Sequence, residues 1–95
     1  MTYMRLVRFM LTPEHVSHAG IIANDLIPAI KEQPGCLSAW FLGGDNDGEC
    51  GLSVHWDTRE HADAASDIIG PRLQRHLSGH VAGPPDIHLF PVLIS

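Results

Sequence analysis

The sequence predicts an α+β fold of the ferredoxin-like class, in which a four-stranded antiparallel sheet carries two helices on one face. Strand-like and helix-like segments follow each other in the order β-α-β-β-α-β. The two central strand segments are separated only by "GGDNDG", whose glycines, asparagine and aspartates favour a turn and hence an antiparallel hairpin. Right-handed crossovers then place both helices on the same face. The 95 residues are expected to form one domain, 1–95.

The first strand and the first helix are predicted from the N-terminal third of the chain. Residues 3–11 alternate imperfectly and include Tyr, Val and Phe, which favour a strand. Thr12 is expected to be the N-cap of the helix and Pro13 its first residue. Apolar residues follow at helical spacing: Val16, Ala19, Ala23, Leu26, Ile27 and Ile30. Pro28 should kink this helix late or end it early, because proline lacks an amide hydrogen and clashes with the preceding turn.

Three more strands and a second helical region are predicted from the rest of the chain. The strands are residues 36–42, 49–56 and 86–94. Asp57 or Thr58 is expected to cap the next helix, and Asp57 with Glu60 has the spacing of a capping box. Gly70 and Pro71 are expected to break this helix. The two resulting pieces would carry the apolar residues Ala62, Ala65, Ile68 and Ile69, and then Leu73, Leu77 and Val81.

The two cysteines are expected to be reduced thiols. If Leu42 pairs with Glu49 in the hairpin, Cys36 lies opposite His55 and not opposite Cys50. Two cysteines do not make a disulfide framework, and a cytoplasmic location would keep them reduced. Cys36 has no basic neighbour in the sequence to lower the pKa of its thiol, so we do not expect it to act as a nucleophile.

Charge and hydropathy exclude several classes of partner. The net charge is −5, and only six Lys and Arg residues are spread along the chain. Nucleic acids and anionic membrane surfaces are bound through concentrated positive charge, so neither is an expected partner. No apolar run approaches the roughly 18 residues of a membrane span. The N-terminal segment lacks a cleavage site of the A-x-A type, which leaves the cytoplasm as the expected location.

The helix-free face of the predicted sheet is apolar. In strand 36–42, Trp40 and Leu42 point to one side, while Leu37, Ala39 and Phe41 point to the other. An antiparallel sheet with one face in water would alternate between apolar and polar residues instead. A helix-free apolar face is a strong association surface. The sequence therefore predicts a homodimer that associates face to face through this side of the sheet.

The segment "SVHWDTREHADAA" contains the best single candidate for a pocket residue, Trp56. A second interpretation is that Trp56 closes the core with its indole N–H bonded. His55 should point to the opposite face of the sheet, towards the dimer interface. Arg8 is expected to be buried beside a carboxylate, in a salt bridge within or across the dimer rather than in contact with substrate.

Several histidines raise the question of a metal site. His76 and His80 have the i, i+4 spacing that lets two imidazoles share a metal ion on one helix face. Gly79 weakens a helix there, and no third ligand is evident from the spacing, although His61 could approach in three dimensions. A solvated polar face is the favoured interpretation, and we expect no bound metal.

Four segments together resemble the antibiotic biosynthesis monooxygenase (ABM) family of the dimeric α+β barrel superfamily, and they cover nearly the whole chain. They are "RFMLTPEH", "KEQPGCLSAWFLGGDND", "SVHWDTREHADAA" and "PPDIHLFPV". The most specific parts are the Pro-Gly before the second strand and the Trp-x-(Ser/Thr)-x-Glu after the third. The resemblance implies a dimeric barrel, and the family includes cofactor-free oxidases of polyketide aromatics, quinol oxidases, haem-degrading enzymes and members without known activity.

The haem-degrading branch of that family implies three site residues, of which this sequence has one. Trp56 matches, and Arg8 matches the arginine of the first strand. The position of the expected asparagine before that arginine is Val7. The expected axial histidine falls near Ala65 or Ser66, neither of which can bind iron. Haem degradation is therefore the third hypothesis.

The polyketide-oxidising branch implies an asparagine four residues before the tryptophan, where this chain has Leu52. Trp56 carries over, together with an arginine on the second helical segment, at Arg72 or Arg75. Cofactor-free oxygenation requires a site that desolvates a reduced aromatic molecule and stabilises its anion. Arg, His and Trp side chains around an apolar cavity suit that chemistry.

The leading hypothesis is a small cofactor-independent monooxygenase that acts on an apolar aromatic or quinonoid molecule. Trp56 would shape the pocket, and Arg8, His76 or Arg75 would polarise an oxygen atom of the substrate. No cofactor is expected. The alternative is a non-catalytic, small-molecule-binding or stress-associated dimer that has kept the barrel and lost the site, which the replacements at Val7 and Ala65 favour.

Overall fold

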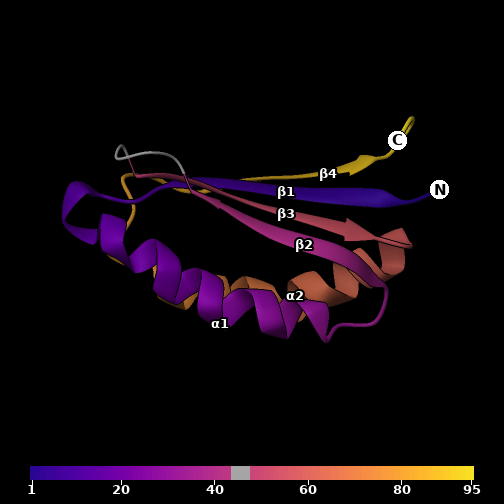
Figure 1. The fold of residues 1–95 in the computed structure, drawn as a ribbon, viewed down its shortest axis with the longest axis horizontal. Helices are drawn as coiled ribbons and strands as arrows, with labels where there is room; N and C mark the ends of the chain where they lie inside the picture. The colour runs from indigo at the N-terminus through magenta and orange to yellow at the C-terminus, as the bar shows by residue number, and fades with distance from the viewer. Residues whose placement is uncertain (44–47) are drawn as a thin grey trace.

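A computed structural model describes residues 1–43 and 48–95. Four antiparallel strands form one sheet in the order β2-β3-β1-β4, and both helices cover the same face of it (Figure 1). This arrangement confirms the predicted fold class. Along the chain the elements are β1 (Tyr3–Met10), the 3-10 helix η1 (Pro13–His18), α1 (Ala19–Lys31), β2 (Cys36–Gly43), β3 (Glu49–Trp56), α2 (Arg59–Leu77) and β4 (Asp86–Pro91).

The core lies between the sheet and the two helices. Strand β3 shows why, because its residues alternate strictly between the buried, helix-covered face and the other face. Its buried residues are Cys50, Leu52, Val54 and Trp56. The helices contribute residues at three- and four-residue spacing, namely Ile22, Leu26 and Ile30 from α1, and Ala62, Ala65, Ile69, Leu73 and Leu77 from α2. Each of these elements therefore directs its apolar face towards one shared core.

The first helical region begins differently from the prediction, and Pro28 does not end it early. Pro13 is at the first position, as expected, but the first turn is a 3-10 helix and Thr12 makes no side-chain capping bond. Thr12 Oγ1 instead lies 2.8 Å from His15 Nδ1. Helix α1 does not end at Pro28 but continues to Lys31. Pro28 is exposed whereas Ile30 is fully buried, so packing of the last turn against the core outweighs the lost backbone hydrogen bond.

Helix α2 runs unbroken through Gly70 and Pro71, so the predicted break is wrong. Ile69 before the pair and Leu73 after it are both buried, while Pro71 itself is exposed. A proline in a helix interior costs about 3 kcal/mol. Burial of one continuous apolar stripe on both sides of Pro71 offsets that cost, because a helix in a protein is stabilised mainly by tertiary packing.

Thr58, and not Asp57, caps helix α2. Thr58 Oγ1 accepts a hydrogen bond from the backbone N–H of His61 at 3.1 Å. Asp57 is therefore not the first residue of a capping box. Its carboxylate accepts a hydrogen bond from His61 Nδ1 at 2.7 Å, which lowers the pKa of Asp57.

The hairpin has a different register from the one predicted. Leu42 pairs with Gly51 and Cys36 with Trp56, with an irregularity between Cys36 and Ser38. The predicted pairs of Leu42 with Glu49 and of Cys36 with His55 are therefore wrong, although Cys36 and Cys50 are indeed far apart in the ladder and form no disulfide. Most of the predicted turn, residues 44–47, lies outside the described residues.

Strand β4 is shorter than predicted. It ends at Pro91 rather than at residue 94. A further backbone hydrogen bond, from the N–H of Val92 to the carbonyl of Thr2 at 2.9 Å, continues the contact with β1 by one residue. Within the described part of the chain, no helix is long and apolar enough to cross a bilayer.

Candidate functional site

A small apolar pocket lies between the helix-covered face of the sheet and helix α2. Its volume is about 60 Å³. The sheet and α1 contribute Arg5, Val7, Ile30, Leu52, Val54, Trp56 and Ile87, and α2 contributes Ala62, Ala65, Ser66, Ile69, Gly70 and Leu73. Four of the six α2 residues are small, so the helix cannot fill the space above the large side chains of β1 and β3. The cluster of small residues in "HADAASDIIG" is the sequence signal for this pocket.

Trp56 forms part of the pocket wall and is also buried in the core. It is the last residue of β3, where Tyr3 of β1 and Cys36 of β2 flank it in the ladder. Its indole Nε1 is buried and finds no hydrogen-bond acceptor within residues 1–43 and 48–95. An unpaired buried donor costs about 1–3 kcal/mol. The ring thus closes the core as the second interpretation expected, but without the hydrogen bond to its N–H that this interpretation required.

Arg5 adds a positive charge to the same pocket and was not singled out from the sequence. It lies two residues before Val7 on β1 and hence on the same face of the sheet. Only 17% of its side-chain surface is exposed, and its Nη2 donates to Asp63 Oδ1 at 3.3 Å. The strand alternation that buries Val7 and Phe9 could have identified Arg5 as an inward-facing residue.

Arg8 lies on the opposite, helix-free face of the sheet, away from Trp56. Its side chain is mostly exposed, so, contrary to the expectation, it is not buried within the single chain. The alternation of β1 explains this placement, because the neighbours Val7 and Phe9 take the buried positions. The expected carboxylate partner is present, since Arg8 Nη2 donates to Glu49 Oε1 at 2.6 Å, and this contact raises the pKa of Arg8.

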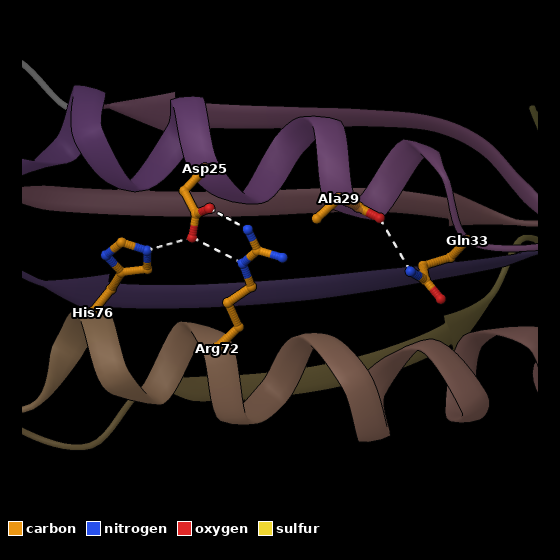
Figure 2. Close-up of polar contacts among 5 residues, drawn as sticks. All are labelled: Asp25, Ala29, Gln33, Arg72 and His76. Carbon is orange, nitrogen blue, oxygen red and sulfur yellow. Dashed lines mark hydrogen bonds and ion pairs between the residues drawn. The ribbon is translucent and has the colours of Figure 1, made fainter.

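His76 lies between the two helices and not in the pocket of Trp56. Figure 2 shows Asp25 of α1 facing His76 and Arg72 of α2. His76 Nε2 donates to Asp25 Oδ2 at 2.7 Å, and Arg72 Nε donates to the same oxygen at 3.0 Å while its Nη2 donates to Oδ1. Hydrogen bonds from Arg72 first, and then from His76, hold the pKa of Asp25 far below its usual range. This cluster links α1 to α2.

Arg75, the remaining sequence candidate, is exposed on α2 and does not line the pocket. The structure thus leaves Trp56 in the pocket and separates it from Arg8, His76 and Arg75. The arginine that lines the pocket is Arg5. Local periodicity predicts the face of a strand or helix on which each residue lies. It does not predict which residues share a pocket, because the pocket is lined by elements far apart in the chain.

Three of the histidines lie close together. The rings of His15, His18 and His80 meet in edge-on or tilted contacts, with ring centroids 4.2 to 5.4 Å apart, and His80 Nδ1 donates to the backbone carbonyl of His76 at 2.8 Å. His61 pairs with Asp57 instead. Among the described residues, no group of three or more His, Cys, Asp or Glu side chains is arranged to hold a metal ion.

Comparison with solved structures identifies relatives of this fold across the whole chain. A Mycobacterium tuberculosis protein superposes with a TM-score of 0.84 at 18% identity, covering 100% of this chain and 98% of that one. A structure described as an antibiotic biosynthesis monooxygenase gives 0.82 at 16% identity, with 97% and 99% covered. A Streptomyces coelicolor monooxygenase in complex with nanaomycin D gives 0.72 at 20% identity, with 98% and 92% covered.

No protein-family model and no curated protein sequence matches the chain significantly. At these identities the likeness concerns the fold alone. The resemblance found in the sequence is confirmed at that level: the chain has the fold of structures described as antibiotic biosynthesis monooxygenases.

Proposed function

We propose that this protein is a cofactor-independent monooxygenase that binds an apolar aromatic or quinonoid molecule against Trp56. The observation that carries the proposal is the buried indole N–H of Trp56, which finds no acceptor among the described residues, beside a pocket with a mostly apolar lining. Apolar pockets with a few well-placed polar groups are the usual form of small-molecule sites. The likeness in fold to a monooxygenase in complex with nanaomycin D supports the same class of reaction.

The reaction needs no electron donor other than the substrate. A CH₂ group of a reduced phenolic aromatic loses two hydrogens and gains one atom of O₂, and the second oxygen atom leaves as water. The step is easiest from the deprotonated phenol, whose negative charge the protein must stabilise. A hydrogen bond from the Trp56 N–H and the positive charge of Arg5 would act on that charge in a desolvated site, where electrostatic interactions are strong.

The size of the pocket constrains how the substrate binds. A benzene-sized ligand fills a cavity of roughly 150 Å³, whereas this pocket offers about 60 Å³. Ile87, on the edge strand β4, lines the pocket and is half exposed, so it forms a movable part of the rim. A ligand ring would displace Ile87 and extend past it towards solvent.

A matched pair of tryptophan variants tests the proposal. Trp56→Phe keeps an aromatic ring and removes the N–H, and we expect it to lower the rate of oxygen uptake with an anthrone or hydroxynaphthalene substrate by about 10²-fold. Trp40→Phe makes the same change on the helix-free face and should leave the rate unchanged. An oxygen electrode measures both. Equal rates for Trp56→Phe and wild type would contradict a role for the indole donor.

The absence of a carboxylate or imidazole from the pocket lining favours a second function, ligand binding without turnover. Of the described residues that line the pocket, only Arg5 and Ser66 are polar or charged apart from the indole of Trp56. None of them is a strong base at neutral pH, so proton removal would depend on the acidity of the substrate. Binding without any oxygen uptake would support this alternative. No lining residue offers an imidazole or thiolate to haem iron, so haem degradation does not fit this pocket.

We further propose that a second copy of the chain covers the helix-free face of the sheet. Apolar side chains gather there in adjacent ladder rows: Met4, Leu6, Met10, Trp40, Leu42 and Phe90. Between them β3 places the small residues Gly51 and Ser53, directly beside Leu42 and Trp40. Large side chains flanking small ones give a self-complementary surface, as a two-fold interface requires.

A further inference from the structure

We propose that Arg5 is a specificity-determining residue that selects aromatic ligands carrying a carboxylate. The inference rests on the proposed ligand pocket and adds the chemical class of its ligand. Among the described residues that line the pocket, Arg5 is the one that carries a charge. Its position on β1, opposite Val54 of β3 and Leu89 of β4, fixes the guanidinium on the helix-covered side of the sheet.

The charge of Arg5 is only partly compensated within the protein. A guanidinium has five N–H donors in a planar fork that matches a carboxylate. Within the described part of the chain, Arg5 makes one side-chain contact, the 3.3 Å bond from Nη2 to Asp63. Because 17% of the Arg5 side chain is exposed, most of this cation is removed from water with a single long bond to balance it.

The partner of Arg5 is easily replaced. Asp63 exposes 62% of its side-chain surface, so its carboxylate stays in contact with water and can leave Arg5 without being desolvated. The contrast with Arg72 is informative, because Arg72 holds Asp25 through both Nε and Nη2, and His76 binds the same carboxylate. Arg72 is therefore committed to a structural link, whereas Arg5 can exchange Asp63 for a carboxylate of the ligand.

The other polar groups of the pocket also suit a ligand that carries hydrogen-bond acceptors. Among the residues that the structure describes, the Trp56 N–H has no acceptor, and the Ser66 hydroxyl is the only neutral acceptor side chain in the lining. A ligand ring in the apolar part of the pocket would offer an oxygen to Trp56 and a carboxylate to Arg5. The net charge of −5 works against general attraction of anions, so selection must come from this local contact.

Benzoate and benzamide form a matched pair of probes, since they have the same shape and differ in charge. Calorimetry gives the two affinities, and the NMR signal of the Trp56 indole N–H reports whether each probe reaches the pocket. We expect wild type to prefer benzoate by about tenfold or more, as a charge-assisted hydrogen bond of about 1.5–3 kcal/mol implies. Arg5→Gln should abolish the preference without changing the affinity for benzamide.

Two further variants separate charge from folding. Asp63→Asn removes the competing carboxylate and should strengthen benzoate binding several-fold, while Arg59→Gln removes an exposed arginine of α2 and should change nothing. Equal binding of both probes to wild type, with the Trp56 signal shifted, would overturn the role of Arg5 and leave the pocket intact. Failure of both probes to shift the Trp56 signal would count against the pocket itself and against the proposed function with it.

Discussion

The two faces of the sheet have similar numbers of large apolar side chains but different surroundings. On the helix-covered face, Phe9 packs edge-on against Phe41 with ring centroids 6.0 Å apart, and both are protected by the helices. On the other face, Trp40 of β2 and Phe90 of β4 are about half exposed, without a helix over them. Sequence alternation assigns residues to a face, but the cover on that face decides whether they stabilise the monomer or an assembly.

The largest expected effect comes from comparing one phenylalanine on each face. Phe9 is 4% exposed and Phe90 is 49% exposed. Phe9→Ala should lower the free energy of unfolding by about 3–5 kcal/mol, because it leaves a cavity in the core. Phe90→Ala should cost less than about 1 kcal/mol at protein concentrations low enough to keep the chain monomeric. Urea unfolding measures both, and similar losses would erase the distinction between the faces.

A charge on each of two exposed apolar sites tests whether the helix-free face associates. Trp40 is 50% exposed on the sheet, and Ile68 is 57% exposed on α2. Trp40→Arg should weaken the dimer by more than tenfold, because it places two arginines in a desolvated two-fold interface. Ile68→Arg adds the same charge outside that face and should leave the protein dimeric.

Sedimentation velocity or native mass spectrometry distinguishes these outcomes. A monomeric wild-type protein at micromolar concentration would contradict the proposed second copy on this face. Dissociation by Ile68→Arg, with Trp40→Arg still dimeric, would move the interface to the helices.

The smallest expected effect concerns the cluster of Asp25, Arg72 and His76, which links the two helices on the covered face of the sheet. The pKa of Asp25 is lowered by Arg72 and His76, so its ionised form stabilises the folded state. That stabilisation is complete above the usual aspartate pKa of about 3.9 and is lost as the pH falls through the lower pKa of the folded state. Asp25→Asn should therefore be less stable than wild type at pH 7, and the difference should shrink below about pH 4.

Thermal unfolding across this pH range measures the difference. Asp67→Asn is the control, because it makes the same substitution at an exposed position of α2. Its stability should follow that of wild type at every pH. A difference between Asp25→Asn and wild type that persists unchanged at pH 2 would show that the carboxylate charge is not the source of the stabilisation.

Much of the fold could be predicted because its strands are encoded locally. Strand β3 was predicted with its observed bounds. The alternating residues that indicate this strand are neighbours in the sequence, and the turn residues come directly before them. Gly70 and Pro71 misled the prediction because local propensity favours a break there, whereas Ile69 and Leu73 gain more from burial against the sheet. Propensity is a property of one segment, and burial depends on what lies opposite.

The candidate site was less predictable for the same reason. Trp56 was identified from its position at the end of a strand, but Arg5 emerged only once β1 was placed beside β3 and α2. Arg8 was expected to be buried because it lies on an imperfectly alternating strand segment. The structure shows that Arg8 faces away, since a strand turns successive side chains to opposite sides.

By itself, the sequence determined the order of the elements, the one-sided placement of the helices and the position of Trp56 at the corner after β3. These features depend on periodicity, turn chemistry and the handedness of crossovers, all of which act over short stretches of chain. Only the tertiary structure decided that Asp25 meets Arg72 and His76, and that Arg5 shares a pocket with Trp56. Those contacts join residues about fifty positions apart, and their energies exist only after burial has brought the elements together.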